Sequence, residues 1–219
     1  MYNAFFFDLD GTLTDPGEGI TGSVAYALEK YGIKVEDRST LNCFIGPPLQ
    51  ESFCKYYGFS PEEGYRAVDK YREYYREKGI FENVMYDGIP NLLSVLKSSG
   101  AFVVMATSKP EVFARQIAEH FGIAEYFDCI TGSELDGRRV AKSEVIACAL
   151  ERMGISNAGS AVMTGDREHD IIGALKNGLY PVGVMYGYGS REELLSSGAA
   201  EVVSDVPELT RHLLSLSKE

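Results

Sequence analysis

The chain has 219 residues, of which 45% are hydrophobic, enough to bury one large domain or a core with a smaller insert. Its formal net charge of −11 at pH 7 argues against a nucleic-acid backbone or an anionic membrane surface as a partner, but not against a small phosphorylated molecule. No apolar stretch is long enough to span a bilayer, and the first predicted strand begins too early to leave room for a signal segment. We therefore expect a cytoplasmic protein without a membrane partner.

The first predicted element is a buried strand over residues 4–8, which ends on two aspartates one residue apart. Alternate residues of a strand share a face, so Asp8 and Asp10 project together where the chain leaves the sheet. Gly11 then allows a sharp turn that a residue with a Cβ would resist. Paired carboxylates repel each other and lose hydration on burial, so they indicate a bound cation or a chemical step more than a simple loop turn.

Residues 17–82 show helical periodicity only, which predicts an all-helical block inserted after the first strand. The predicted helices of this block cover residues 20–31, 49–57 and 62–78. Pro16-Gly17 and residues 83–88 would be its two hinges. The segments 1–16 and 83–219 would then form one core domain around the insertion.

Strand-like and helix-like segments alternate after residue 85, a pattern typical of a parallel sheet with helices on both faces. The predicted strands are 101–106, 127–131, 160–165, 181–185 and 200–203, and the predicted helices are 88–99, 111–122, 142–153, 168–178, 191–197 and 206–217. Prolines near several helix starts and glycines after several helix ends support these boundaries. We therefore predict an α/β core with an inserted all-α domain.

Polar residues follow the strand predicted at 101–106. Thr107 and Ser108 offer hydroxyl groups there. Thr107 could also cap the next helix, a role compatible with a place in the site, or Ser108 could be the capping residue. Lys109 reads equally well as an exposed loop residue and as a substrate contact. Because the carboxyl ends of parallel strands meet at one edge of a sheet, we expect Thr107 to lie near Asp8 and Asp10.

Three further candidates come later in the chain. Lys142 begins a predicted helix, where a lone lysine is often merely solvated, and Asp166 and Asp170 follow the strand predicted at 160–165. One helical turn separates the two aspartates, so both can face the same site. Aspartates, a hydroxyl and a lysine suit phosphoryl transfer, which depends on positioning and on cancelling charge. Gly187-Tyr188-Gly189, after the next strand, is interpreted as a flexible turn.

The segment from Phe6 to Asp15 resembles the first signature of the haloacid dehalogenase superfamily, Asp-x-Asp-Gly-Thr-Leu-x-Asp. Thr107, Lys142 and the pair Asp166 and Asp170 stand in the order in which that superfamily places its other three motifs. The resemblance covers nearly the whole chain. It implies a Rossmann-like parallel core and places the helical insert at the position of a cap domain. Ser143 departs from the proline that many relatives carry after the lysine.

The resemblance also implies roles for these residues. Asp8 would be the nucleophile that forms an aspartyl phosphate, and Asp10 would act as general acid and then as general base. The implied Mg²⁺ ligands are Asp8, the main-chain carbonyl of Asp10, Asp166 and, directly or through a water, Asp170. Thr107 and Lys142 would complete the catalytic set. The candidate phosphate-binding residues are Gly11, Thr107, Ser108 and Lys142.

The implied function is a Mg²⁺-dependent phosphatase that hydrolyses a small phosphorylated metabolite, similar to phosphoglycolate phosphatases. The alternatives, in decreasing order, are a 5′-nucleotidase, a phosphotransferase similar to β-phosphoglucomutases, and a non-enzymatic receiver that keeps the phosphate on its aspartate. Asp10 argues against dehalogenation and phosphonate hydrolysis, because enzymes for those reactions lack this residue. The sequence identifies neither the substrate nor the oligomeric state.

Overall fold

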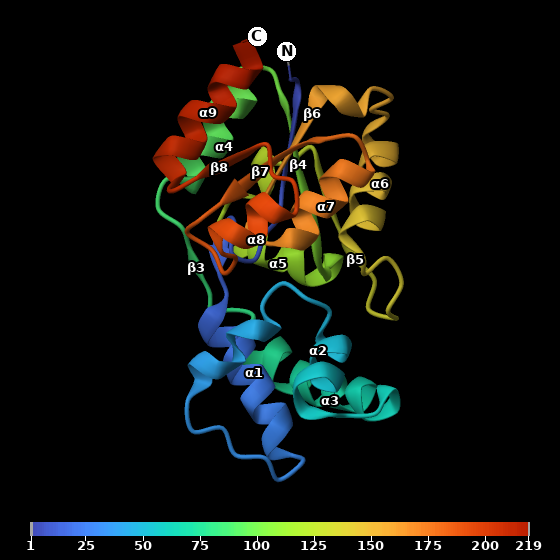
Figure 1. Cartoon of the computed structure of the whole chain (residues 1–219). Helices are drawn as coiled ribbons and strands as arrows, with labels where there is room; N and C mark the ends of the chain where they lie inside the picture. Colours follow the sequence, from blue (N-terminus) through green and yellow to red (C-terminus); the bar gives the residue numbers. More distant parts are fainter. Residues whose placement is uncertain (1, 219) are drawn as a thin grey trace. The chain divides into compact units, whose positions relative to one another are not determined.

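The computed structural model describes residues 2–218 (Figure 1). The chain divides into two compact units, one formed by the segments up to Asp15 and from Met85 onward, the other by Pro16–Val84. None of the helices within residues 2–218 combines the length and the apolar character that a membrane span requires.

The first unit contains a six-stranded parallel sheet with the strand order β5-β4-β1-β6-β7-β8. Its strands are β1 (Ala4–Phe7), β4 (Phe102–Pro110), β5 (Cys129–Ser133), β6 (Ala161–Gly165), β7 (Tyr180–Val184) and β8 (Glu201–Val203). Every residue of β1 is buried, because this strand lies between β4 and β6 in the middle of the sheet. The predicted parallel sheet is confirmed.

The helices of this unit are α4 (Ile89–Ser98), α5 (Glu111–His120), α6 (Lys142–Met153), α7 (Glu168–Lys176), α8 (Arg191–Ser196) and α9 (Val206–Lys218). Figure 1 shows α4 and α9 on the opposite side of the sheet from α6 and α7. Phe6 and Met163 of the sheet pack in one buried cluster with Val145 and Ile146 of α6 and Ala174 of α7. The predicted arrangement of helices on both faces is therefore confirmed.

Strand β4 is longer than predicted. It continues past Ala106 to Pro110, and its pairing with β5 changes register between these two residues. Thr107 therefore lies within an extended strand rather than after it. Two short strands, β2 (Thr14–Asp15) and β3 (Val84–Met85), pair with each other in a separate sheet that the sequence pattern does not predict.

The second unit is helical. It contains α1 (Gly17–Glu29), the 3₁₀ helix η1 (Arg38–Phe44), α2 (Leu49–Tyr57), α3 (Pro61–Tyr74) and the π-helix η2 (Tyr75–Gly79). Gly19 and Gly79 let α1 and η2 approach closely, because a Cβ on Gly19 would overlap the carbonyl oxygen of Gly79. The rings of Phe44 and Phe53, 5.0 Å apart, belong to the buried core of this unit.

Candidate active site

Three buried carboxylates meet at the carboxyl edge of the sheet. Asp8, Asp166 and Asp170 each offer one oxygen atom, and these oxygens lie within 4.8 Å of one another. The cause is the pairing of β1 with β6, which places Phe7 opposite Thr164, so that the residues after both strands emerge side by side. From β1 the chain adds β4 and β5 on one side of the sheet and then β6, β7 and β8 on the other, so the strand order switches at β1. Open α/β sheets bind ligands at such switch points.

Lys142 lies between two of these carboxylates. Its Nζ is 2.7 Å from Oδ1 of Asp8 and 2.8 Å from Oδ1 of Asp170, and it donates a 3.2 Å hydrogen bond to the carbonyl of Ala106. Burial would lower the pKa of Lys142, but the charges of Asp170 and Asp8 outweigh it and raise that pKa. Lys142 is therefore a buried cation and not a solvated lysine.

The structure adds Lys109 to the site. Its Nζ lies 2.6 Å from Oδ2 of Asp10. Burial raises the pKa of Asp10, and Lys109 opposes that rise. The interpretation of Lys109 as an exposed loop residue is wrong. Residues i and i+2 of an extended strand share a face, so Lys109 lies on the same face as Thr107 only because β4 extends to Pro110, an extension that the sequence pattern does not predict.

Thr107 is almost fully buried, and its Oγ1 accepts a 3.2 Å hydrogen bond from the backbone N–H of Lys109. Helix α5 begins at Glu111 after Pro110, which provides no side-chain cap. Neither Thr107 nor Ser108 caps this helix, so that alternative is wrong. Thr107 lies instead on β4, the same strand that holds Lys109 beside Asp10.

A segment after β7 packs directly on Asp166. The backbone N–H of Tyr188 donates a 2.7 Å hydrogen bond to Oδ2 of Asp166. A Cβ on Gly187 would overlap Asp166 and the carbonyl oxygen of Gly11, and a Cβ on Gly189 would overlap the carbonyl oxygen of Asp166. This segment is a tightly packed support for a site residue rather than a free turn, which corrects the prediction.

Gly11 also packs against Asp166. Its φ is 79°, in the region that glycine enters readily, and a Cβ there would overlap the carboxylate of Asp166. The turn after β1 can therefore approach Asp166 only with glycine at this position. Gly11 therefore lies beside the carboxylate of Asp166, and its role in phosphate binding stays a prediction.

The carboxylate group has the chemistry of a divalent-cation site. Among residues 2–218, Oδ1 of Asp166 is a buried oxygen without a hydrogen-bond partner. Burial and the charges of Asp170 and Asp8 raise the pKa of Asp166 well above its ordinary value. Burial also raises the pKa of Asp170 to about 6, although Lys142 opposes this rise. A cation would relieve this repulsion, and Mg²⁺ prefers such oxygen ligands, so the residues present fit the expected metal.

The parallel sheet, with buried carboxylates and two buried lysines at its carboxyl edge, has the site architecture of an α/β hydrolytic enzyme. A family model described as haloacid dehalogenase-like hydrolase matches residues 5–184. The chain therefore belongs to the haloacid dehalogenase-like hydrolase family.

The chain is similar to individual proteins over most of its length. A Pseudomonas aeruginosa protein named 5′-nucleotidase is 47% identical over 98% of this chain and 96% of its own length. A Mycobacterium tuberculosis protein named tyrosine-protein kinase PtkA is 39% identical over 90% of this chain and 67% of its own length. A Neisseria meningitidis protein named phosphoglycolate phosphatase is 27% identical over 96% of this chain and 93% of its own length. The crystal structure of a predicted phosphatase from Clostridium acetobutylicum has a TM-score of 0.96 and 54% identity, over 98% of this chain and 99% of that one.

Proposed function

We propose that the protein is a Mg²⁺-dependent phosphatase that hydrolyses a small phosphate monoester in the cytoplasm. The observation that carries this proposal is the position of Lys142, whose ammonium contacts both Asp8 and Asp170. A nucleophilic carboxylate must approach an anionic phosphoryl group, and a buried cation beside it lowers the electrostatic cost of that approach.

In the proposed reaction, an oxygen of Asp8 attacks phosphorus and the bond from phosphorus to the leaving oxygen breaks. Asp10 gives its proton to that leaving oxygen, so an alcohol departs and an aspartyl phosphate remains. Asp10 then takes a proton from a water molecule, whose oxygen attacks phosphorus. The bond between phosphorus and the Asp8 oxygen breaks, which releases inorganic phosphate and restores the Asp8 carboxylate. Burial raises the pKa of Asp10 although Lys109 opposes the rise, and a raised pKa helps a carboxyl group to hold the proton that the first step needs.

The other residues hold these groups in place. Lys142 orients Asp8 and offsets charge on the phosphoryl group, while Thr107, Ser108 and Gly11 are the proposed phosphate-binding positions. The proposed Mg²⁺ ligands are the carboxylates of Asp8, Asp166 and Asp170, together with the main-chain carbonyl of Asp10. When bound, Mg²⁺ would neutralise charge on the transferring group. The helical unit Pro16–Val84 is the proposed cap that selects the substrate.

Among substrates we favour nucleoside monophosphates over 2-phosphoglycolate, which reverses the order expected from the sequence. The support is the much higher identity to the relative named 5′-nucleotidase than to the relative named phosphoglycolate phosphatase. Phosphate transfer to another acceptor is the remaining alternative, since it shares the first chemical step with hydrolysis.

The test is phosphate release from a panel of esters, each assayed with Mg²⁺ and with chelator. The panel holds several nucleoside monophosphates, 2-phosphoglycolate, β-glucose 1-phosphate and acetyl phosphate. We expect metal-dependent turnover with the highest kcat/KM for a nucleoside monophosphate. A best substrate of another class would overturn the substrate proposal alone. Stable phosphorylation of Asp8 by acetyl phosphate without turnover of any ester would overturn the phosphatase proposal.

A further inference from the structure

Arg139 has an unusual backbone conformation for a residue with a side chain. Its φ is 54°, and within residues 2–218 every other residue with positive φ is a glycine. The left-handed region costs a residue with a Cβ free energy, so such a conformation persists where surrounding contacts enforce it. Arg139 lies three residues before Lys142, in the loop that connects β5 to α6.

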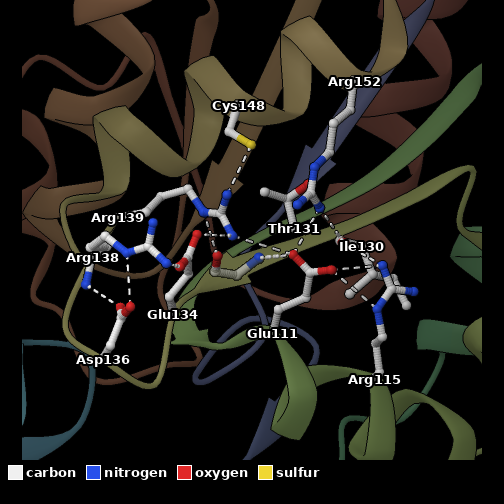
Figure 2. Close-up of polar contacts among 11 residues, drawn as sticks. Glu111, Arg115, Ile130, Thr131, Glu134, Asp136, Arg138, Arg139, Cys148 and Arg152 are labelled. Carbon is white, nitrogen blue, oxygen red and sulfur yellow. Dashed lines mark hydrogen bonds and ion pairs between the residues drawn. The ribbon is translucent and has the colours of Figure 1, made fainter.

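The guanidinium of Arg139 holds this loop against three elements, as Figure 2 shows. Its Nε donates a 2.8 Å hydrogen bond to the carbonyl of Gly132 at the end of β5. One terminal nitrogen donates to Sγ of Cys148 on α6 at 3.2 Å, and the other lies 3.7 Å from Glu111 on α5 and 3.6 Å from Glu134 in the loop. The side chain is 18% exposed, so these contacts are largely shielded from water.

Gly132 and Glu111, two residues that Arg139 contacts, also pack against the segment that contains Lys109. A Cβ on Gly132 would lie 2.5 Å from the carbonyl oxygen of Lys109 and 2.6 Å from the backbone nitrogen of Glu111. The backbone N–H of Gly132 also donates to Oε2 of Glu111 at 3.4 Å. Arg115 and Arg152 fix that carboxylate further, at 2.9 Å and 2.8 Å. The end of β5 is thus packed closely against the start of α5, and Arg139 contacts both, through a hydrogen bond to Gly132 and an ion pair with Glu111.

Helix α6 needs such support because its first turn has no side-chain cap from Ala141. On one side the side-chain amide of Asn177 donates a 3.0 Å hydrogen bond to the carbonyl of Ser143. Gly173 of α7 leaves room for Lys142, since a Cβ there would lie 3.0 Å from Cγ of Lys142. Helix α7 therefore supports one side of the first turn of α6, and the contacts of Arg139 fix the loop that leads into it.

We propose that Arg139 is a positioning residue, which fixes the loop Glu134–Ala141 and the first turn of α6 so that Lys142 stands between Asp8 and Asp170. This inference rests on the proposed phosphatase function. It assigns Arg139 no contact with substrate. Its effect on the reaction passes through the placement of the Lys142 ammonium.

A different role for Arg139 would be to shield the edge of the sheet. Strand β5 is an edge strand, and Arg115 and Arg139 donate hydrogen bonds to its carbonyls at Ile130 and Gly132. Side chains that cover an edge prevent pairing with another chain. If shielding were the whole role of Arg139, its loss would cause self-association without changing the kcat of the monomer.

The test compares Arg139→Gly with Arg138→Gly. Glycine accepts the φ of Arg139 without strain, so the first variant removes the guanidinium contacts and keeps the backbone path. The second removes the same charge from the adjacent residue, whose side chain is 72% exposed and pairs with Asp136 and Glu134 within the loop, whereas Arg139 bonds to β5 and α6. For wild type and both variants we would measure kcat and KM with p-nitrophenyl phosphate and Mg²⁺, with and without millimolar guanidinium. The melting temperature and the mass in solution of each protein would be measured separately.

We expect Arg139→Gly to lose kcat by about tenfold or more, with KM nearly unchanged, because small misplacements of charged groups cost large factors in rate. Guanidinium should restore part of the lost kcat in this variant and none in Arg138→Gly. A wild-type kcat in Arg139→Gly, or a loss that guanidinium does not rescue and that follows the melting temperature or self-association, would overturn the positioning role.

If Arg139→Gly does not fold, Arg139→Lys keeps the charge but not the fork of donors. A folded Arg139→Lys protein with kcat lowered threefold or more supports the proposal, and a wild-type kcat overturns it. Wild-type enzyme in the same assay separates the two inferences. No turnover by wild type contradicts the proposed function, whereas normal wild-type turnover with unchanged variants contradicts only the role of Arg139.

Discussion

Lys109 and Asp10 form a buried ion pair, and both side chains are almost fully shielded from water. Such a pair is costly to break from one side, because the remaining charge stays in a poorly solvated site and loses the opposite charge beside it. The pair also gives the proposed acid–base residue a fixed orientation before any substrate arrives. Its contribution can be separated from that of Lys142, which contacts Asp8 and Asp170 instead.

We predict that Lys109→Met destabilises the fold by about 3 to 5 kcal/mol, the usual cost of leaving one charge of a buried pair unpaired. Asp10→Asn combined with Lys109→Met should cost less than the sum of the two single changes, because the double variant has no unpaired charge. Urea unfolding of the four proteins measures this coupling. Additive costs would mean that the two side chains do not interact in solution.

Asp8→Asn should lower turnover by on the order of 10⁴-fold or more, since an amide cannot serve as the attacking oxygen. Its melting temperature should be unchanged or higher, because the substitution removes one of the clustered carboxylates. Asp10→Asn should slow turnover by roughly 10²- to 10⁴-fold through loss of proton transfer. A steady-state assay beside a thermal melt gives both numbers, and a wild-type rate in Asp8→Asn would refute the mechanism.

Gly187→Ala should weaken Mg²⁺ binding, because the added Cβ would overlap Asp166 and push this carboxylate from its place. Disturbing the groups that orient a metal ligand typically costs roughly 10- to 100-fold in affinity. The measurement is the Mg²⁺ concentration that gives half of the maximal thermal stabilisation. Gly159→Ala is the matched control, since its Cβ meets only the side chain of Asn157, at 3.3 Å. Equal Mg²⁺ dependence in both variants would contradict the prediction.

Glu111 should make stability depend on pH. Burial would raise its pKa, but hydrogen bonds from Arg115 and Arg152 outweigh burial and lower that pKa below its ordinary value of 4.5. A carboxyl group with a lower pKa in the folded state stabilises the fold above its ordinary pKa and loses this effect as pH falls through the folded-state value.

Wild type should therefore exceed Glu111→Gln in free energy of unfolding by about 1 kcal/mol at neutral pH, a modest value because Arg115 and Arg152 are partly exposed. This difference should shrink below pH 4.5, the ordinary pKa of the group. Urea titrations of the two proteins at several pH values measure it. A difference that stays constant across the acidic range would show that the ion pairs contribute nothing.

The sequence is sufficient to predict β1, the parallel sheet and the meeting of Asp8 with Asp166 and Asp170. Apolar runs identify the strands, and the geometry of parallel sheets brings their carboxyl ends together. Lys109 could not be assigned in this way, because the extension of β4 to Pro110 depends on pairing with Ser133 of β5. Local pattern contains no information about that pairing.

Arg139 was missed for a related reason. Its φ of 54° depends on partners in β5, α5 and α6, and no property of its neighbours in the sequence indicates a left-handed arginine. The packing of Gly187 and Gly189 on Asp166 was likewise hidden. Glycines after a strand predict a turn, and only the folded chain shows that a carboxylate fills the space beside them.

The pairing of β1 with β6 also has a consequence for synthesis. Asp8 leaves the ribosome early, whereas Asp166 and Asp170 follow after most of the chain has been made. The three carboxylates proposed to bind the cation therefore cannot come together until these distant strands pair, a contact of long sequence separation that forms slowly. Nascent chains should be unable to bind metal or turn over substrate, and both abilities should arise together, late in folding.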